Sequence, residues 1–207
     1  MLDLLTNRPI VPVIEINDAN DAVPLAEALL KGGIDIIEVT FRTAAAADAI
    51  SQIRKALPDM LTGAGTVVTP ETITRALDAG ATFGVAPGFN PDTVEAFRSA
   101  NVPFLPGVAT SSEIEKALSL DCKVLKFFPA EAAGGIKSLK AISGPYASFG
   151  FKFCPTGGVN LGNLEDYLAL PIVTSIGGSW IATKQQIADK DWSGIRARAA
   201  EALSLAR

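Results

Sequence analysis

The chain has 207 residues, of which 48% are hydrophobic and 19% are charged, so it can bury a core and is not intrinsically disordered. Its 18 Lys and Arg residues against 22 Asp and Glu residues give a net charge of −4, and no basic run is present, which argues against a nucleic-acid surface. An anionic ligand would therefore need a local, preorganised binding site.

The residue types that are missing exclude several kinds of chemistry. The chain contains no histidine, which excludes Ser-His-Asp and Cys-His nucleophiles, HExxH zinc sites and every imidazole general base. Clustered carboxylates of the DxD type are also missing, so we expect no metal site. The two cysteines, Cys122 and Cys154, are too few for a metal quartet, and we expect them to be reduced and structural.

The chain shows no sign of membrane insertion or export. No apolar run approaches the roughly 20 residues that a membrane-spanning helix needs. The first nine residues, MLDLLTNRP, lack the charged and then apolar pattern of a signal peptide. We therefore expect a cytoplasmic protein that does not bind membranes.

In chain order, short β-branched segments alternate with longer helical ones. We expect strands over residues 10–16, 34–40, 61–66, 82–87, 102–107, 123–129, 150–158 and 171–180. The helices between them begin at typical capping residues, and a helical C-terminus rich in Ala, Leu and Arg follows the last strand. The residues that mark these helix ends are Asn17, Asp18 and Asn20, then Gly32 and Gly33, then Thr69 with Pro70, Pro91, and Thr110 to Ser112.

Eight strand segments alternating with helices predict parallel βαβ units, and eight such units are typical of an α/β protein with a (β/α)8 TIM barrel. We expect a single barrel domain over residues 1–207. A doubly wound open sheet is the competing architecture, but no GxGxxG motif follows the first strand. In a barrel, the functional residues lie where the strands end and the βα loops begin.

Lys126 is the first candidate for chemistry, because it lies within the apolar run 124–128. Burying a lysine is costly, and burial favours the neutral amine, which can attack a ketone to form a Schiff base. Alternatively, Lys126 pairs with a carboxylate or extends its amine to water. Lys152 also lies between aromatic residues, in GFKFCP, so the pattern alone does not distinguish the two lysines.

Glu38 is the second candidate, a carboxylate in the otherwise apolar strand IDIIEVT. Without histidine, a buried glutamate is a natural general acid and base. Glu15 in the first strand is a second such carboxylate, and a buried ion pair with a lysine is the alternative for either. Arg42, at the end of the second strand, offers a planar fork that suits a carboxylate, although it could equally be a surface arginine.

Two glycine pairs close the seventh and eighth predicted strands, in PTGGVN and IGGSW. Many barrels bind phosphate at these strands through backbone N–H groups. Tight turns also use Gly-Gly, so one pair alone says little. Two pairs at these strands, with the Ser179 hydroxyl beside the second, predict a phosphate site.

Taken together and in this order, EVTFR, GAGTV, APGF, PGVAT, KFFPAE, PTGGV and GGSW resemble the family of 2-keto-3-deoxy-6-phosphogluconate (KDPG) aldolases, which also act as 4-hydroxy-2-oxoglutarate (KHG) aldolases. The resemblance covers essentially the whole chain. It implies a class I, metal-free and cofactor-free (β/α)8 aldolase, a homotrimer that acts on a phosphorylated keto acid and pyruvate.

The resemblance also implies a role for individual residues. Lys126 matches the Schiff-base lysine, and Glu38 matches the general acid and base. The other matches are Arg42 and Thr66 for the pyruvate carboxylate, Pro87 and Phe128 for the pyruvate pocket, and Thr156, Gly157, Gly158, Gly178 and Ser179 for the phosphate and the substrate hydroxyls. This match separates Lys126 from Lys152.

The departures from the family pattern are mild. Ala86 stands where relatives often have Ser, and Phe41 where many have Leu, while Glu15 occupies a position that varies and where a carboxylate could alter substrate preference. The alternatives are an aldolase for a related sugar acid such as the galactonate epimer, a phosphosugar isomerase on the same barrel, and a ligand-binding barrel without catalysis. The last of these leaves Lys126 and Glu38 unexplained.

Overall fold

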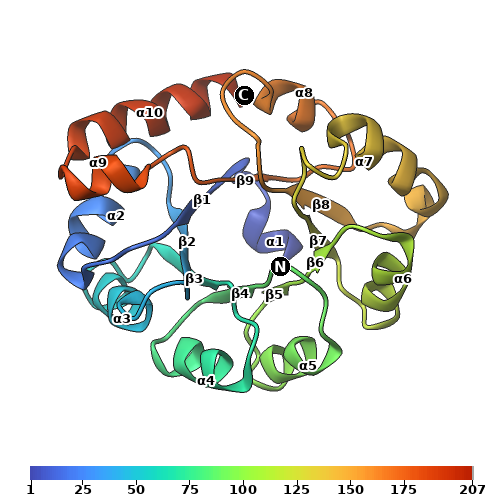
Figure 1. Ribbon diagram of the computed structural model, residues 1–207, viewed down its shortest axis with the longest axis horizontal. Helices are drawn as coiled ribbons and strands as arrows, with labels where there is room; N and C mark the ends of the chain where they lie inside the picture. Colours follow the sequence, from blue (N-terminus) through green and yellow to red (C-terminus); the bar gives the residue numbers. More distant parts are fainter. Residues whose placement is uncertain (207) are drawn as a thin grey trace.

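The computed structural model describes residues 1–206, and Figure 1 shows its strands as an inner ring with helices around the outside. The strands are β1 (Ile10–Ile14), β2 (Ile36–Thr40), β3 (Leu61–Gly65), β4 (Phe83–Val85), β5 (Phe104–Leu105), β6 (Gly107–Val108), β7 (Val124–Phe127), β8 (Lys152–Pro155) and β9 (Ile176–Gly178). The α-helices are α1 (Leu2–Leu5), α2 (Ala22–Lys31), α3 (Ala46–Ala56), α4 (Pro70–Asp78), α5 (Pro91–Ser99), α6 (Ser111–Ser119), α7 (Gly135–Ser143), α8 (Leu164–Leu168), α9 (Lys184–Ala188) and α10 (Trp192–Leu205), and the 3-10 helices are η1 (Ala19–Asp21) and η2 (Gly144–Phe149). The predicted alternation of strands and helices is confirmed.

The strands form a curled parallel sheet. Six of them pair in the order β5-β4-β3-β2-β1-β9, and three pair in the order β6-β7-β8. A parallel bridge between Thr156 and Gly177 lies beside β8 and β9, at one seam between the two groups. At the other seam, β5 and β6 follow one another directly in the chain. All carboxyl ends of the strands therefore face the same edge of the sheet.

The predicted fifth strand, 102–107, is interrupted, and Pro106 is the reason. Proline has no N–H to donate to a neighbouring strand, so a ladder breaks where it stands. Its carbonyl still accepts a hydrogen bond of 2.8 Å from the N–H of Lys126. The first strand is also shorter than predicted, because β1 ends at Ile14 and leaves Glu15 at the start of the loop.

The helix starts follow the local rules of capping. Thr69 and Thr110 accept hydrogen bonds from the third residue of α4 and of α6, and both helices carry a complete capping box. Asn90 caps α5 directly before Pro91. Asp18 differs from the prediction, because it caps the short η1 and not the longer α2 that follows.

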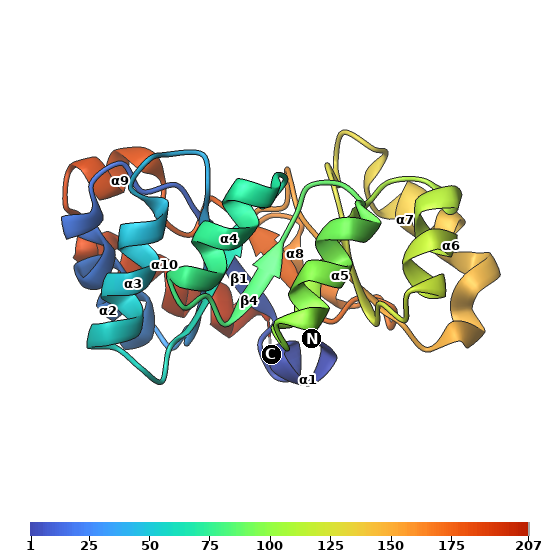
Figure 2. The same ribbon diagram turned by 90° about the horizontal axis from the view of Figure 1, so that it is seen from below.

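The core lies inside the ring of strands and between the strands and the helices. The strand side chains are almost all buried, and the helices turn apolar stripes toward them, as Leu25 and Leu29 of α2 do. Helix α1 ends shortly before β1 begins and lies across the amino ends of the strands, which Figure 2 shows at the lower edge of the molecule. The opposite edge, with the carboxyl ends of the strands, carries the residues described next. No helix among residues 1–206 is long and apolar enough to cross a membrane.

Candidate active site

Strands β2 and β7 bring a carboxylate and an amine together in the interior. Nζ of Lys126 donates a hydrogen bond of 3.3 Å to Oε1 of Glu38, although 88 residues separate them in the chain. Their side chains are only 5% and 4% exposed. Within residues 1–206, this is the one hydrogen bond that either side chain makes. A buried ion pair contributes little to stability, because desolvation offsets the attraction, so the pair is a candidate for function.

The surroundings of Lys126 are apolar. Its Nζ lies 5.5 Å from the centre of the Phe128 ring, and Cys154 is its register partner on β8. Burial raises the pKa of the Cys154 thiol to about 12, an effect that the charge of Lys126 only partly opposes. The thiol is therefore neutral at ordinary pH and does not compete with the amine as a nucleophile.

Gly65 makes room for the Glu38 carboxylate. A Cβ atom at Gly65 would lie 2.2 Å from Oε1 and 2.7 Å from Cγ of Glu38. Real Cβ atoms do not approach other atoms so closely, so Glu38 could not keep its position beside any larger residue at 65. Reasoning from the sequence missed this role, although the repeated small residues of GAGT hinted at a close approach.

Arg42 and Thr66 meet at the ends of β2 and β3. Nε of Arg42 donates a hydrogen bond of 3.3 Å to Oγ1 of Thr66. Thr66 has a φ of 58°, which is uncommon for a β-branched residue and turns the chain at the strand end. Arg42 is exposed and forms no ion pair with any described carboxylate. Its guanidinium is therefore available to an anionic ligand.

Pro87 and Phe128 lie next to the strand that carries Lys126. Gly107 of β6 is the register partner of Lys126. A Cβ atom at Gly107 would lie 2.1 Å from the Pro87 carbonyl oxygen, so the loop after β4 packs directly on β6. The Phe128 ring lies beside the amine, as described above. The structure thus groups both predicted pocket residues around Lys126.

The two glycine pairs lie at adjacent strand ends. Thr156 is buried and forms its bridge with Gly177, directly before Gly178 and the exposed Ser179. Gly157 and Gly158 have φ values of 97° and 85°, a conformation that favours glycine. Among the residues that the structure describes, no protein atom accepts a hydrogen bond from the N–H of either glycine. Successive free N–H groups of this kind form a concave site for an anion.

Two other predicted residues have partners other than Lys126. Nζ of Lys152 donates to the carbonyl of Pro171 at 2.6 Å, where β8 begins, so this lysine faces away from the carboxyl ends. Glu15 accepts a hydrogen bond of 2.6 Å from the exposed Lys184 of α9, which confirms the alternative of an ion pair, here only part-buried. The described residues contain no group of three or more Cys, Asp or Glu side chains that could hold a metal ion.

Comparison with known proteins identifies the family of this chain. The family model "KDPG and KHG aldolase" matches residues 2–198. A 2-dehydro-3-deoxy-phosphogluconate aldolase of Treponema pallidum is 46% identical, over 99% of this chain and 97% of its own length. A KHG/KDPG aldolase of Escherichia coli K12 is 42% identical, over 99% of this chain and 95% of its own length.

Two solved structures are also closely similar. The first is a KDPG aldolase from Legionella pneumophila with pyruvate captured at low pH as a covalent carbinolamine intermediate, which is 44% identical with a TM-score of 0.92 and covers 96% of each chain. The second is the 2-keto-3-deoxy-6-phosphogluconate aldolase of Zymomonas mobilis with 3-phosphoglycerate. It is 37% identical with a TM-score of 0.90 and covers 97% of this chain and 94% of the other.

Proposed function

The chain belongs to the KDPG and KHG aldolase family, and from this premise we propose that it is a class I aldolase. It reversibly cleaves 2-keto-3-deoxy-6-phosphogluconate to pyruvate and glyceraldehyde 3-phosphate, and it also cleaves 4-hydroxy-2-oxoglutarate to pyruvate and glyoxylate. The observation that carries this proposal is the buried pair of Lys126 and Glu38, which places a nucleophilic amine 3.3 Å from a proton acceptor.

The reaction begins with the Lys126 side chain as a neutral, nucleophilic amine. The neutral amine attacks the C2 ketone of the substrate to give a carbinolamine, which loses water to form an iminium ion. The iminium ion is an electron sink, so no metal or cofactor is required for bond cleavage. Pyruvate bound as a covalent carbinolamine in the Legionella relative supports this route.

Glu38 then acts as general base and acid. Directly or through water, its carboxylate takes the C4 hydroxyl proton while the C3–C4 bond breaks, and the bonding electrons pass into the iminium. Glyceraldehyde 3-phosphate leaves, and an enamine remains on Lys126. Glu38 or its water returns a proton to C3, and hydrolysis of the resulting imine releases pyruvate.

The remaining predicted residues bind the two ends of the substrate. The Arg42 guanidinium and the Thr66 hydroxyl hold the C1 carboxylate, since Arg42 has a planar fork and no described acidic partner. Pro87 and Phe128 shape the apolar part of the pyruvate pocket. The substrate phosphate and hydroxyls bind at Thr156, Gly157, Gly158, Gly178 and Ser179, where N–H groups supply the attraction that the acidic chain lacks. The Zymomonas relative, whose structure contains 3-phosphoglycerate, supports an anion site of this kind.

The architecture and assembly complete the proposal. Two seams between the strand groups support closure into a (β/α)8 barrel, at the Thr156–Gly177 bridge and at β5 and β6. Residues 1–207 then form one domain, which limited proteolysis tests. The homotrimer stays a prediction, which sedimentation equilibrium tests. The cytoplasmic location also stays a prediction, which cell fractionation tests.

Borohydride reduction in the presence of pyruvate tests the mechanism. We expect a stable adduct that peptide mass mapping places on Lys126. The variant Lys126→Ala should give no adduct and no cleavage. The matched control is Lys152→Ala, because Lys152 also lies in a strand between aromatic residues but donates to the Pro171 carbonyl away from the carboxyl ends.

The outcomes distinguish the remaining possibilities. Loss of the adduct in Lys126→Ala and its retention in Lys152→Ala support the proposal. A protein that binds pyruvate without forming an adduct overturns it, and a phosphosugar isomerase, which needs no imine, becomes the better explanation. Comparing cleavage rates of the gluconate and galactonate epimers, and of phosphorylated and unphosphorylated keto acids, identifies the preferred substrate.

A further inference from the structure

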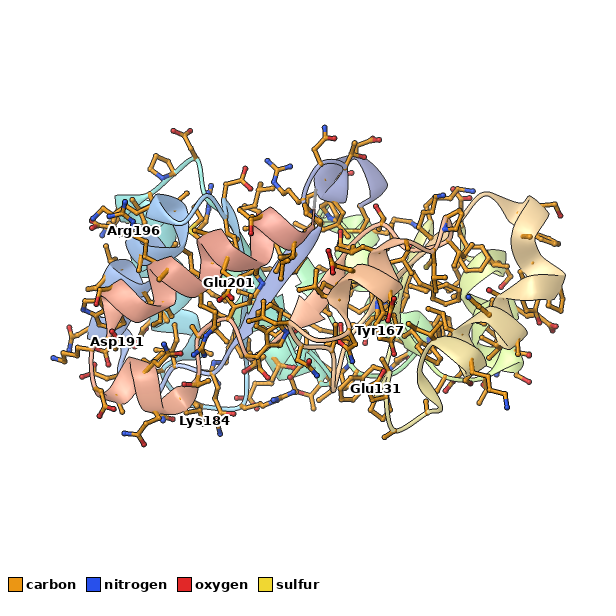
Figure 3. The ribbon with its side chains drawn as sticks, turned by 90° about the horizontal axis from the view of Figure 1, so that it is seen from above. Glu131, Tyr167, Lys184, Asp191, Arg196 and Glu201 are labelled. Atoms are coloured by element: carbon orange, nitrogen blue, oxygen red, sulfur yellow. The ribbon has the colours of Figure 1, made fainter. Side chains whose placement is uncertain are left out.

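A buried tyrosine binds a carboxylate next to the Gly157–Gly158 turn. Tyr167 of α8 is fully buried, and its hydroxyl donates a hydrogen bond to Oε1 of Glu131, in the turn after β7. Figure 3 shows the two labelled side chains side by side, Glu131 nearer the edge of the molecule where Lys184 lies. Burial, together with the Glu131 carboxylate, raises the pKa of Tyr167, so the hydroxyl stays protonated and donates. Neither residue has a role in the mechanism above.

The Glu131 segment holds the glycine turn from one side. The N–H of Ala130 donates 2.8 Å to the carbonyl of Thr156, and the N–H of Glu131 donates 3.0 Å to the carbonyl of Gly157. The stem of Glu131 also covers Gly158, where a Cβ atom would lie 2.5 Å from Cγ of Glu131. Glu131 therefore contacts the turn twice, through its backbone at Gly157 and through its side chain at Gly158.

Two asparagines hold the turn from the other side. The amides of Asn160 and Asn163 donate to the carbonyl of Gly158 at 3.0 Å and 3.4 Å. The carbonyls of Thr156, Gly157 and Gly158 thus all accept hydrogen bonds from the protein. Within the described part of the chain, the N–H groups of Gly157 and Gly158 donate to no protein atom. Asn163 directly precedes α8, so Tyr167 lies one turn along the same helix.

The negative charge of Glu131 is unfavourable beside an anion-binding turn, so its presence there needs an explanation. Glu131 is exposed, and an ionised carboxylate beside an anion-binding turn weakens anion binding through like-charge repulsion. A carboxylate there needs a local reason. The hydrogen bond from Tyr167 supplies one, because it draws Oε1 toward α8 and fixes the stem of Glu131 over Gly158.

We propose that Glu131 and Tyr167 are positioning residues that hold the Thr156–Gly158 turn in the shape that binds the phosphate of the substrate. This inference rests on the proposed function, because it concerns the phosphate end of the same substrate. The pair acts on affinity for phosphorylated substrate and takes no part in imine formation or bond cleavage.

Steady-state kinetics with the two substrates test the pair. In Tyr167→Phe and in Glu131→Ala, we expect KM for 2-keto-3-deoxy-6-phosphogluconate to rise roughly threefold to tenfold, the range that loss of one hydrogen bond produces. The kcat for this substrate and the KM for unphosphorylated 4-hydroxy-2-oxoglutarate should stay close to those of the wild type. Glu131→Gln keeps an acceptor for Tyr167 and loses the charge, so its KM should equal or fall below the wild-type value.

Tyr146→Phe is the matched control, since the hydroxyl of Tyr146 donates 2.9 Å to Glu115 in the same kind of pair, away from the glycine turn. Its kinetic constants should equal those of the wild type. An unchanged KM for phosphorylated substrate in both Tyr167→Phe and Glu131→Ala overturns the inference. An equal rise in KM for both substrates also overturns it, because a general structural defect would produce that result. Borohydride trapping with pyruvate separates this failure from failure of the proposed function, because only the latter abolishes the adduct in the wild-type protein.

Discussion

Replacing Gly65 by alanine tests the position of Glu38 without altering any reacting group. Gly65 ends β3 beside Glu38, and its added Cβ would lie 2.2 Å from Oε1 of the carboxylate. To regain an ordinary contact of 3.4 Å, the carboxylate must move by about 1.2 Å. Such a movement breaks its hydrogen bond of 3.3 Å with Lys126 or displaces the proton acceptor from the substrate.

The expected loss follows from this displacement. A shift of about 1 Å in a catalytic group can reduce the rate by about 10²-fold. Alanine fits the extended backbone of a strand, so we expect the fold to persist and kcat for cleavage to fall by about that factor. Lys126 keeps its place on β7, so borohydride trapping with pyruvate should still label it.

Pyruvate release, coupled to NADH oxidation by lactate dehydrogenase, measures kcat. Gly144→Ala is the control, because a Cβ atom at Gly144 meets nothing within 4 Å and its φ of −50° suits alanine. Thermal unfolding of both variants shows that they are folded. A wild-type kcat in Gly65→Ala would refute the argument that the carboxylate acts from the position described.

Three further predictions follow from single groups. Glu38→Gln should still form the pyruvate adduct but turn over about 10² to 10⁴ times more slowly, and equal turnover would rule out its acid–base role. Burial raises the pKa of Cys154 from 9.0 to about 12, so the neutral thiol contributes fully to the stability of the folded state below about pH 9. This contribution, about 4 kcal/mol at most, is lost as the pH rises toward 12. The free energy of unfolding, measured with denaturant at about pH 8 and about pH 11, should therefore fall less between the two pH values in Cys154→Ala than in the wild type. Thr110→Ala removes the α6 cap and should lower the free energy of unfolding by about 1 kcal/mol, whereas the neighbouring Ser112→Ala should change it little.

The order of strands and helices was predictable because it depends on local rules. Thr69 with Pro70, and Thr110 with Glu113, begin helices through short-range hydrogen bonds that the sequence itself displays. The β-branched runs mark the buried strands in the same way. What the local pattern did not show is the break at Pro106, where a single missing N–H interrupts the ladder.

The site was only partly predictable, because its geometry depends on contacts between distant residues. The pattern around Lys126 and Lys152 is alike, and what separates them in space is the partner of each amine, Glu38 for one and the Pro171 carbonyl for the other. The contact between Tyr167 and Glu131 joins residues on two different βα units, so no local pattern announces it. Motif resemblance did locate the residues that meet at the strand ends, because each motif occupies one such end.

The distribution of charge explains how an acidic chain can favour an anionic substrate. With a net charge of −4, the protein offers no long-range attraction to a phosphorylated keto acid. Two lysines near the carboxyl ends are already paired, Lys126 with Glu38 and Lys184 with Glu15. In the site that we propose, the attraction comes from the Arg42 guanidinium and from N–H dipoles such as those of Gly157 and Gly158. Dipoles act only at contact distance, so under this proposal the orientation of the glycine turn matters more for affinity than the net charge does.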